Sequence, residues 1–148
     1  MSVATNLGAV NERVRHLIAE LQLEPHPEGG YYRETFRSDR QLPSSALPRS
    51  YGGSRVAVTA ILFLLPTAAS SARHRVRSDE IWMHHQGDPV RLSVEGEPDL
   101  LLGEDLLFQA TVPGGRWQSA VCLDGPAGYA LVGCVVAPGF DFLDFELA

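Results

Sequence analysis

Short β-type segments separated by tight turns fill most of the chain after its first thirty residues, and this pattern limits the fold more than any other feature. Turn-forming clusters of Gly, Pro and Asp recur at residues 87–89, 95–98, 113–115 and 124–126. Segments at such short, regular spacing are typical of a β-sandwich or β-barrel. No long helical segment lies between them to provide a parallel crossover, so we expect an antiparallel all-β fold. The expected strands are residues 31–37, 55–65, 73–77, 80–86, 90–95, 100–104, 109–112, 117–123 and 129–136.

One α-helix is expected before the strands, over about residues 7–24. Apolar residues recur at helical spacing from Val10 to Leu21 and form one face. Pro25 and Pro27 follow, and a proline ends a helix because it lacks the backbone donor and clashes with the preceding turn.

The length of 148 residues suits a single domain spanning residues 1–148. Within it we expect a barrel core over residues 55–137 and a C-terminal segment over residues 138–148. Residues 38–54 are rich in Ser, Pro, Gly and Arg and predict a loop longer than usual, either a functional flap or a locally disordered stretch.

The basic residues are unusual because all twelve are arginine and none is lysine. Schiff-base chemistry and a lysine general base are therefore excluded. The net charge is −6, and the arginines form no basic stripe, so we expect no nucleic-acid partner. No apolar run has the length of a membrane span, and the N-terminus lacks a signal-peptide pattern, so we expect a cytoplasmic protein with no membrane partner.

Several motifs resemble those of the cupin superfamily. His74 precedes Glu80 by six positions, Gly87 follows Glu80 by seven, and a Pro-Gly-Gly-Arg-Trp-Gln segment spans residues 113–118. A Pro-His-Pro-Glu-Gly-Gly motif at residues 25–30 and a Pro-Gly-Phe-Asp-Phe motif near the C-terminus are similar to those of one single-domain branch of this superfamily. The resemblance implies a double-stranded β-helix, or jelly-roll barrel, that is usually a homodimer. It also implies a structure closer to sugar-nucleotide epimerases than to metal oxygenases.

The sequence departs from the general cupin pattern at two metal-ligand positions. The His-x-His pair is reduced to His74, because residue 72 is alanine, and the final histidine is replaced by Gln118. His84 has the same strand parity as Glu80 and is expected to face the same side. A divalent metal, if one is bound, would use His74, Glu80, His84 and Gln118; we favour no cofactor, since glutamine is a weak ligand.

Without a metal, the same region still contains acid–base groups. His74 is the candidate general base, because histidine titrates near neutral pH, and Tyr31 or Tyr32 is the candidate acid. Arg33 shares strand parity with Tyr31, and Glu34 shares it with Tyr32, so one of these pairs faces the pocket. The candidate catalytic residues are His74, Tyr31, Tyr32 and Glu80.

The remaining candidates concern substrate binding. Two tryptophans stack on a sugar if they line the pocket and otherwise belong to the core. His26 and Glu28 lie in the turn before the first strand, where we expect them to brace the turn. The candidate substrate-binding residues are Arg33, Glu34, Trp82, His84, Trp117 and Gln118.

These residues suit the removal of a proton next to a carbonyl group. We therefore predict a metal-independent isomerase or epimerase acting on a sugar, a sugar phosphate or a nucleotide sugar. One alternative is a cupin that binds a small ligand without catalysis, and a second is a metal-dependent cupin enzyme. The expected partners are a small sugar-like substrate and a second copy of the chain.

Overall fold

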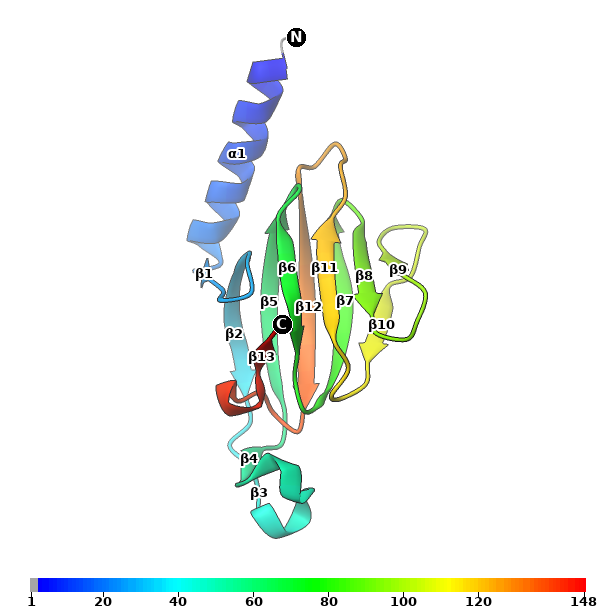
Figure 1. Ribbon diagram of the computed structural model, residues 1–148. Helices are drawn as coiled ribbons and strands as arrows, with labels where there is room; N and C mark the ends of the chain where they lie inside the picture. Colours follow the sequence, from blue (N-terminus) through cyan, green and yellow to red (C-terminus); the bar gives the residue numbers. More distant parts are fainter. Residues whose placement is uncertain (1–2) are drawn as a thin grey trace.

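Two antiparallel sheets face each other and form the body of the protein (Figure 1). The structure, a computed structural model, describes the backbone of residues 3–148 and the side chains of residues 12–148. The six-stranded sheet has the order β1-β2-β5-β12-β7-β10, and the five-stranded sheet has the order β13-β6-β11-β8-β9. Their strands are β1 (Glu24–Pro25), β2 (Tyr31–Arg37), β5 (Thr59–Pro66), β6 (Ser70–Arg75), β7 (Asp79–Gly87), β8 (Val90–Val94), β9 (Leu100–Leu102), β10 (Gln109–Val112), β11 (Gln118–Cys122), β12 (Tyr129–Ala137) and β13 (Glu146–Leu147). The antiparallel all-β fold predicted from the sequence is confirmed.

The central strands β5 and β12 are apolar on both faces because both faces are covered. Phe63 and Val132 point into the space between the sheets, where they join the main core. Leu64 and Leu131 point outward and pack in a second cluster with Leu17 of the N-terminal helix. A strand covered on both sides reads as a continuous apolar run, which explains why these two segments show so little alternation.

The N-terminal helix α1 spans Val3–Glu20, so it begins and ends about four residues before the predicted limits of 7–24. Its final turn closes at Gln22, whose φ of 55° is left-handed and ends the helical path. The chain then extends into β1, where Glu24 pairs with Tyr32 of β2. Among the helices of the described residues, none has the length and apolar character that crossing a membrane requires.

Residues 38–54 carry more local structure than the predicted loop. They contain β3 (Gln41–Leu42) and two short 3-10 helices, η1 (Ser44–Ala46) and η2 (Arg49–Tyr51), below the sheets in Figure 1. The predicted strand 55–65 is divided, because β4 (Arg55–Val56) pairs with β3 whereas β5 joins the large sheet.

Candidate active site

A cavity of about 250 Å³ opens between the two sheets, close to the turn before β2. Its wall combines side chains from both sheets with others from that turn and from the C-terminal segment. The lining residues are Glu24, His26, Glu28, Tyr32, Glu34, Thr59, Ile61, His74, Val76, Glu80, Cys134, Val136, Phe140 and Phe142. This end of the β-helix is therefore hollow, whereas the other end is filled by the main core.

Glu28 and His74 form a buried pair on this wall. Glu28 Oε2 lies 3.0 Å from His74 Nε2, and Ser71 Oγ donates a hydrogen bond of 3.0 Å to Glu28 Oε1. His74 Nδ1 lies 2.7 Å from the Ala72 carbonyl oxygen. A carbonyl oxygen only accepts hydrogen bonds, so Nδ1 carries a proton, and the short contact at Nε2 requires one further proton shared with Glu28.

The pKa values of both groups are consistent with this shared proton. Burial, together with the nearby Glu80, raises the pKa of Glu28 to about 8, while the hydrogen bond from Ser71 opposes the shift. Burial lowers the pKa of His74, partly offset by its bond to Ala72. The pair therefore holds one proton near neutral pH, and burial favours the uncharged form, in which Glu28 donates to His74.

Two glycines place Glu28 against His74. Gly29 and Gly30 have φ values of 110° and 70°, which other residues rarely adopt. A Cβ on Gly29 would also collide with the Ser70 carbonyl oxygen of β6. The close approach lets the Ala72 amide donate a 2.7 Å hydrogen bond to the Glu28 carbonyl, which fixes the turn on the strand that carries His74.

Glu80 lines the cavity at the end of a second polar chain. Trp82 Nε1 donates to Gln118 Oε1 at 2.9 Å, and Gln118 Nε2 donates to Glu80 Oε1 at 2.8 Å. Burial raises the pKa of Glu80 to about 7, while hydrogen bonds from Gln118 and Cys134 oppose the shift. Gln118 is 1% exposed and does not line the cavity, so it binds Glu80 from the side of the protein core.

The residues at the predicted metal positions do not fit a metal ion. Both ends of the Gln118 amide are engaged, by Trp82 and by Glu80, and both ring nitrogens of His74 have partners. Within residues 12–148, no group of three or more His, Cys, Asp or Glu side chains has an arrangement that could hold a metal ion.

The two candidate tyrosines face opposite sides of β2. Tyr32 lines the cavity, and burial raises its pKa, with smaller contributions from Glu24 and Glu34 on either side. Tyr31 instead packs outward beside helix α1. Arg33 shares that outward side and donates a 2.6 Å hydrogen bond to Gln22 Oε1. Tyr31 and Arg33 therefore do not lie in the cavity, contrary to one of the two predicted registers.

Three other predicted site residues also lie outside the cavity. Trp82 is fully buried in the main core, and Trp117 packs beneath Arg75, whose guanidinium lies 4.6 Å from the ring centroid. His84 lines a separate hollow, although its parity matches that of Glu80. An extended strand rises about 3.3 Å per residue, so four residues carry His84 roughly 13 Å along β7, with Trp82 filling the space between.

The sequence interpretation missed the role of the turn before β2. Glu28 and His26 were expected to brace this turn, yet both line the cavity. The His26 ring accepts a 3.1 Å hydrogen bond from the Glu28 amide, and burial lowers the pKa of His26 to about 4, with His74 contributing. The sequence signal that could have indicated this role is the position of Glu28 between a proline and two glycines. These neighbours fix the conformation of the turn, which a turn that only faces solvent does not need.

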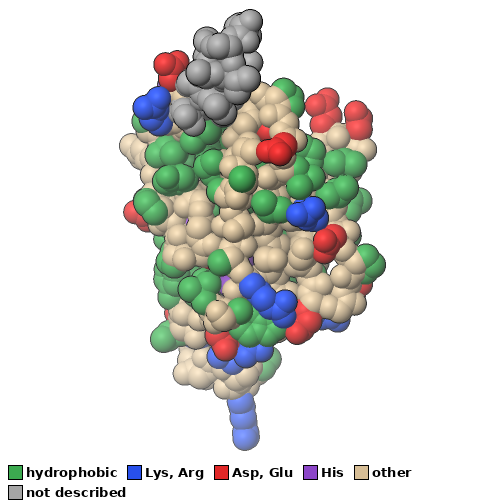
Figure 2. All heavy atoms as spheres, turned by 45° about the horizontal axis from the view of Figure 1, so that its top comes forward, with side chains coloured by type: hydrophobic (Ala, Val, Ile, Leu, Met, Phe, Trp, Pro, Cys, Tyr) green, Lys and Arg blue, Asp and Glu red, His purple; other side chains and the backbone are tan. Residues whose placement is uncertain are grey.

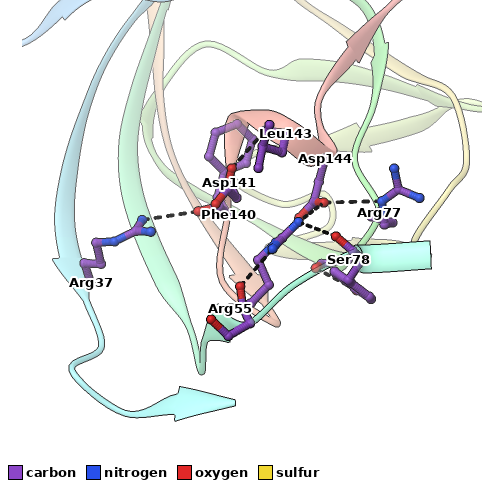
Figure 3. Close-up of polar contacts among 10 residues, drawn as sticks. Arg37, Arg55, Arg77, Ser78, Phe140, Asp141, Leu143 and Asp144 are labelled. Atoms are coloured by element: carbon purple, nitrogen blue, oxygen red, sulfur yellow. Dashed lines mark hydrogen bonds and ion pairs between the residues drawn. The ribbon is translucent and has the colours of Figure 1, made fainter. Parts of the chain in front are cut away.

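The C-terminal segment closes one side of the cavity with Phe140 and Phe142. Figure 3 shows how it is held: Asp144 points between Arg55 and Arg77. The Arg55 guanidinium makes two 2.8 Å hydrogen bonds to the Asp144 carboxylate, and this pair is buried. The short helix η3 (Phe142–Asp144) contains Phe142, and strand β13, which follows it, pairs with β6. Together they hold the aromatic side chains over the opening of the cavity.

The fold and the cavity together define a class, a double-stranded β-helix domain with a small cavity between its sheets that carries buried acid–base groups. The sequence profile of the Cupin superfamily (DUF985) family matches residues 15–148, and the chain belongs to this family. The resemblance to cupins inferred from the sequence motifs is thereby confirmed.

Solved structures support this assignment. A hypothetical protein from Leishmania major is 39% identical, with a TM-score of 0.80, over 90% of this chain and 86% of that one. A protein from Shewanella oneidensis is 38% identical, with a TM-score of 0.75, over 90% of this chain and 82% of that one. KdgF from a Halomonas species is 16% identical, with a TM-score of 0.58, over 82% of this chain and 91% of that one, and it shares the fold. A search of curated proteins found no match.

Proposed function

We propose that this protein is an isomerase or epimerase that moves a proton next to the carbonyl group of a small sugar-like molecule. The observation that carries the proposal is the 3.0 Å contact between Glu28 Oε2 and His74 Nε2 on the cavity wall. A carboxyl group and an imidazole that share one proton form an acid–base group suited to neutral pH. The proposed reaction uses neither a metal nor an organic cofactor.

The proton acceptor in this proposal is Glu28, in place of the base predicted from the sequence. Both ring nitrogens of His74 are already bonded, so the imidazole has no lone pair left for a substrate proton. A carboxylate oxygen keeps a second lone pair after accepting one hydrogen bond, so Glu28 can still accept a proton from the cavity. His74 acts as the positioning residue that determines the protonation state of Glu28.

The proposed step begins when the shared proton rests on His74 and Glu28 is ionised. A Glu28 oxygen takes the proton from the carbon next to the carbonyl. The electron pair of that C–H bond forms a carbon–carbon double bond, and the π pair of the carbonyl moves to its oxygen. Tyr32 donates a hydrogen bond to this oxygen as negative charge develops, and the protonated His74 lies beside the same region. Delivery of a proton to the opposite face of the same carbon completes an epimerisation. Transfer of the proton to the neighbouring carbon, with the hydroxyl proton moving to the former carbonyl oxygen, completes an aldose–ketose isomerisation.

The size and environment of the cavity support this reading. A volume of about 250 Å³ lies below the range of roughly 300–1,000 Å³ typical of pockets for drug-sized ligands, which favours a small substrate. The raised pKa of Tyr32 keeps its hydroxyl protonated, as a hydrogen-bond donor must be. Burial of the acid–base pair excludes water from the proton it holds.

Deuterium exchange tests the proposal. The protein is incubated in D₂O with a panel of free aldoses and ketoses and their phosphate esters, and label at the carbon next to the carbonyl is measured by NMR. We expect the wild type to exchange at least one of them and Glu28→Gln to lower that rate about 100-fold or more, as loss of a general base does. Exposed Glu97 lies outside the cavity, so Glu97→Gln is the matched control.

Two results would contradict the proposal. If Glu28→Gln exchanges label as fast as the wild type, then the buried pair is not the acid–base group. If the wild type binds a sugar of the panel but exchanges none, the protein is better described as a cupin that binds a small ligand without catalysis.

A further inference from the structure

The cavity wall is acidic and contains no arginine. Four carboxyl groups line it, from Glu24, Glu28, Glu34 and Glu80, and its other titratable residues are histidine, tyrosine and cysteine. Because the chain has no lysine, arginine is its one type of permanently charged cation. The side chain that proteins use most often to hold phosphate and carboxylate is thus absent from the described wall.

Four arginines have partners outside the cavity wall. Arg55 and Arg77 bind Asp144, and Arg73 and Arg75 cover the ring of Trp117. On the face shown in Figure 2, basic side chains stand on the outer surface, interspersed with acidic ones.

Arg37 contacts two residues of the wall, Phe140 and Glu34. Its guanidinium donates a 3.2 Å hydrogen bond to the Phe140 carbonyl and lies 3.5 Å from Glu34 Oε2. Figure 3 shows this side chain reaching the backbone of Phe140. Arg37 itself does not line the cavity, and its guanidinium is held by Phe140 and Glu34.

The carboxyl groups fall into two sets by depth. Glu24 and Glu34 are exposed and flank Tyr32, since Glu24 pairs with Tyr32 across the sheet and Glu34 is two residues along the same strand. Glu28 and Glu80 are buried, and their raised pKa values make them partly protonated near neutral pH, when they donate hydrogen bonds as well as accept them. A ligand therefore meets negatively charged carboxylates at the entrance. Inside the cavity it meets carboxyl groups in both the protonated and the ionised form.

We propose that the substrate is an uncharged sugar, a free aldose or ketose, and that this wall rejects sugar phosphates, nucleotide sugars and uronates. Sugar hydroxyls donate hydrogen bonds to carboxylates, and the apolar face of a sugar ring packs on aromatic side chains such as Tyr32 and Phe142. An anionic substituent would meet like charge, and no arginine lines the described wall to balance it. This inference rests on the proposed function and narrows the substrate class that the sequence left open.

Matched ligands test the inference. Binding to the wild-type protein is measured by titration calorimetry and by saturation-transfer NMR for glucose, fructose, mannose and xylose. The same measurements are made for glucose 6-phosphate, fructose 6-phosphate and glucuronate. We expect at least one free sugar to bind and its charged counterpart to bind about tenfold or more weakly, because like-charge contacts oppose it.

A variant at the entrance isolates the electrostatic cause. Glu34 is exposed, so Glu34→Gln should fold normally and should narrow the difference between a sugar and its phosphate ester. Glu97→Gln, which leaves the cavity unchanged, should preserve that difference. Raising the salt concentration should narrow it as well.

The outcomes separate this inference from the proposed function. Binding of a phosphate ester or of glucuronate as tightly as the free sugar would overturn the inference, as would failure of every free sugar to bind at millimolar concentration. Exchange of deuterium into phosphate esters alone would overturn the inference and leave the proposed reaction intact. Binding of free sugars without any exchange would overturn the reaction and leave the inference intact.

Discussion

Glu28 is the residue on which the chemistry of the cavity depends, and its position follows from backbone requirements. Its turn needs two consecutive glycines, Gly29 and Gly30, because both have positive φ and the first touches β6. The carboxyl group is thereby held in a buried site beside His74. Placing an acid where burial opposes its ionisation costs stability, and this cost is expected at a functional position.

That cost predicts a specific dependence of stability on pH. The pKa values of Glu28 and Glu80 are raised to about 8 and about 7, so the folded state holds their protons more tightly than the unfolded state. In their protonated form, the two carboxyl groups stabilise the folded state. This contribution is fully present below the unfolded pKa near 4.5 and is lost as the pH rises through their pKa values in the folded state. The histidines His26 and His74 have lowered pKa values and act in the opposite direction, but only below about pH 6.5.

The effect of the two carboxyl groups is therefore separated from that of the histidines between pH 6.5 and 8. We expect the free energy of unfolding, from urea denaturation, to fall by about 2 kcal/mol across it. Glu28→Gln should remove most of that slope, because glutamine does not titrate. An unchanged slope in this variant would show that Glu28 is not the titrating group.

The cupin-like motifs predicted two of the cavity residues from the sequence, whereas strand parity wrongly placed Trp82 and His84 beside them. His74 and Glu80 both line the cavity, as the resemblance to cupins implied, whereas Gln118, which was expected with them, lies behind the wall. The choice between Tyr31 and Tyr32 needed the register of β2 on β5, which no local pattern contains. Glu28 lies in a turn, where neither the helical nor the strand period applies, so periodicity gave no indication of its role.

At the scale of secondary-structure elements, the C-terminal segment depends on one buried ion pair. Asp144 accepts two 2.8 Å hydrogen bonds from Arg55 and a third, of 3.3 Å, from Arg77. Sequence patterns place Phe140 and Phe142 in an aromatic stretch but say nothing of what holds them over the cavity. This contact joins positions 89 residues apart, so it is visible only in the folded chain.

Breaking this pair should be costly. Asp144→Asn leaves the Arg55 charge buried without a counter-charge, and we expect the free energy of unfolding to fall by about 3–5 kcal/mol. Glu146→Gln provides the control, because the Arg75–Glu146 pair is 41% and 56% exposed and such pairs contribute about 0–1 kcal/mol. Urea denaturation of both variants measures the difference. Equal losses would mean that the Arg55–Asp144 pair does not anchor the segment.

At the scale of the whole molecule, most of strand β2 forms an open edge of the six-stranded sheet. Strand β1 pairs only with Tyr31 and Tyr32, so the rest of β2 has no neighbour on that side among the described residues. Phe36 lies on this edge and is 55% exposed. An unpaired edge with an exposed aromatic side chain favours pairing with another chain. The homodimer expected from the sequence resemblance would cover this edge.

Light scattering tests the assembly directly. We expect a mass of twice the 16.1 kDa of the chain, and we expect Phe36→Glu to shift it toward the monomer, because the new charges would oppose each other across a symmetric contact. Leu143 is 79% exposed and lies in the C-terminal segment, so Leu143→Glu is the control for an added charge at an exposed apolar position. A monomeric wild type would contradict the homodimer, and a Phe36→Glu dimer as stable as the wild type would place the contact on another face. Because β2 also carries Tyr32 and Glu34, a contact along this edge would couple assembly to the entrance of the cavity.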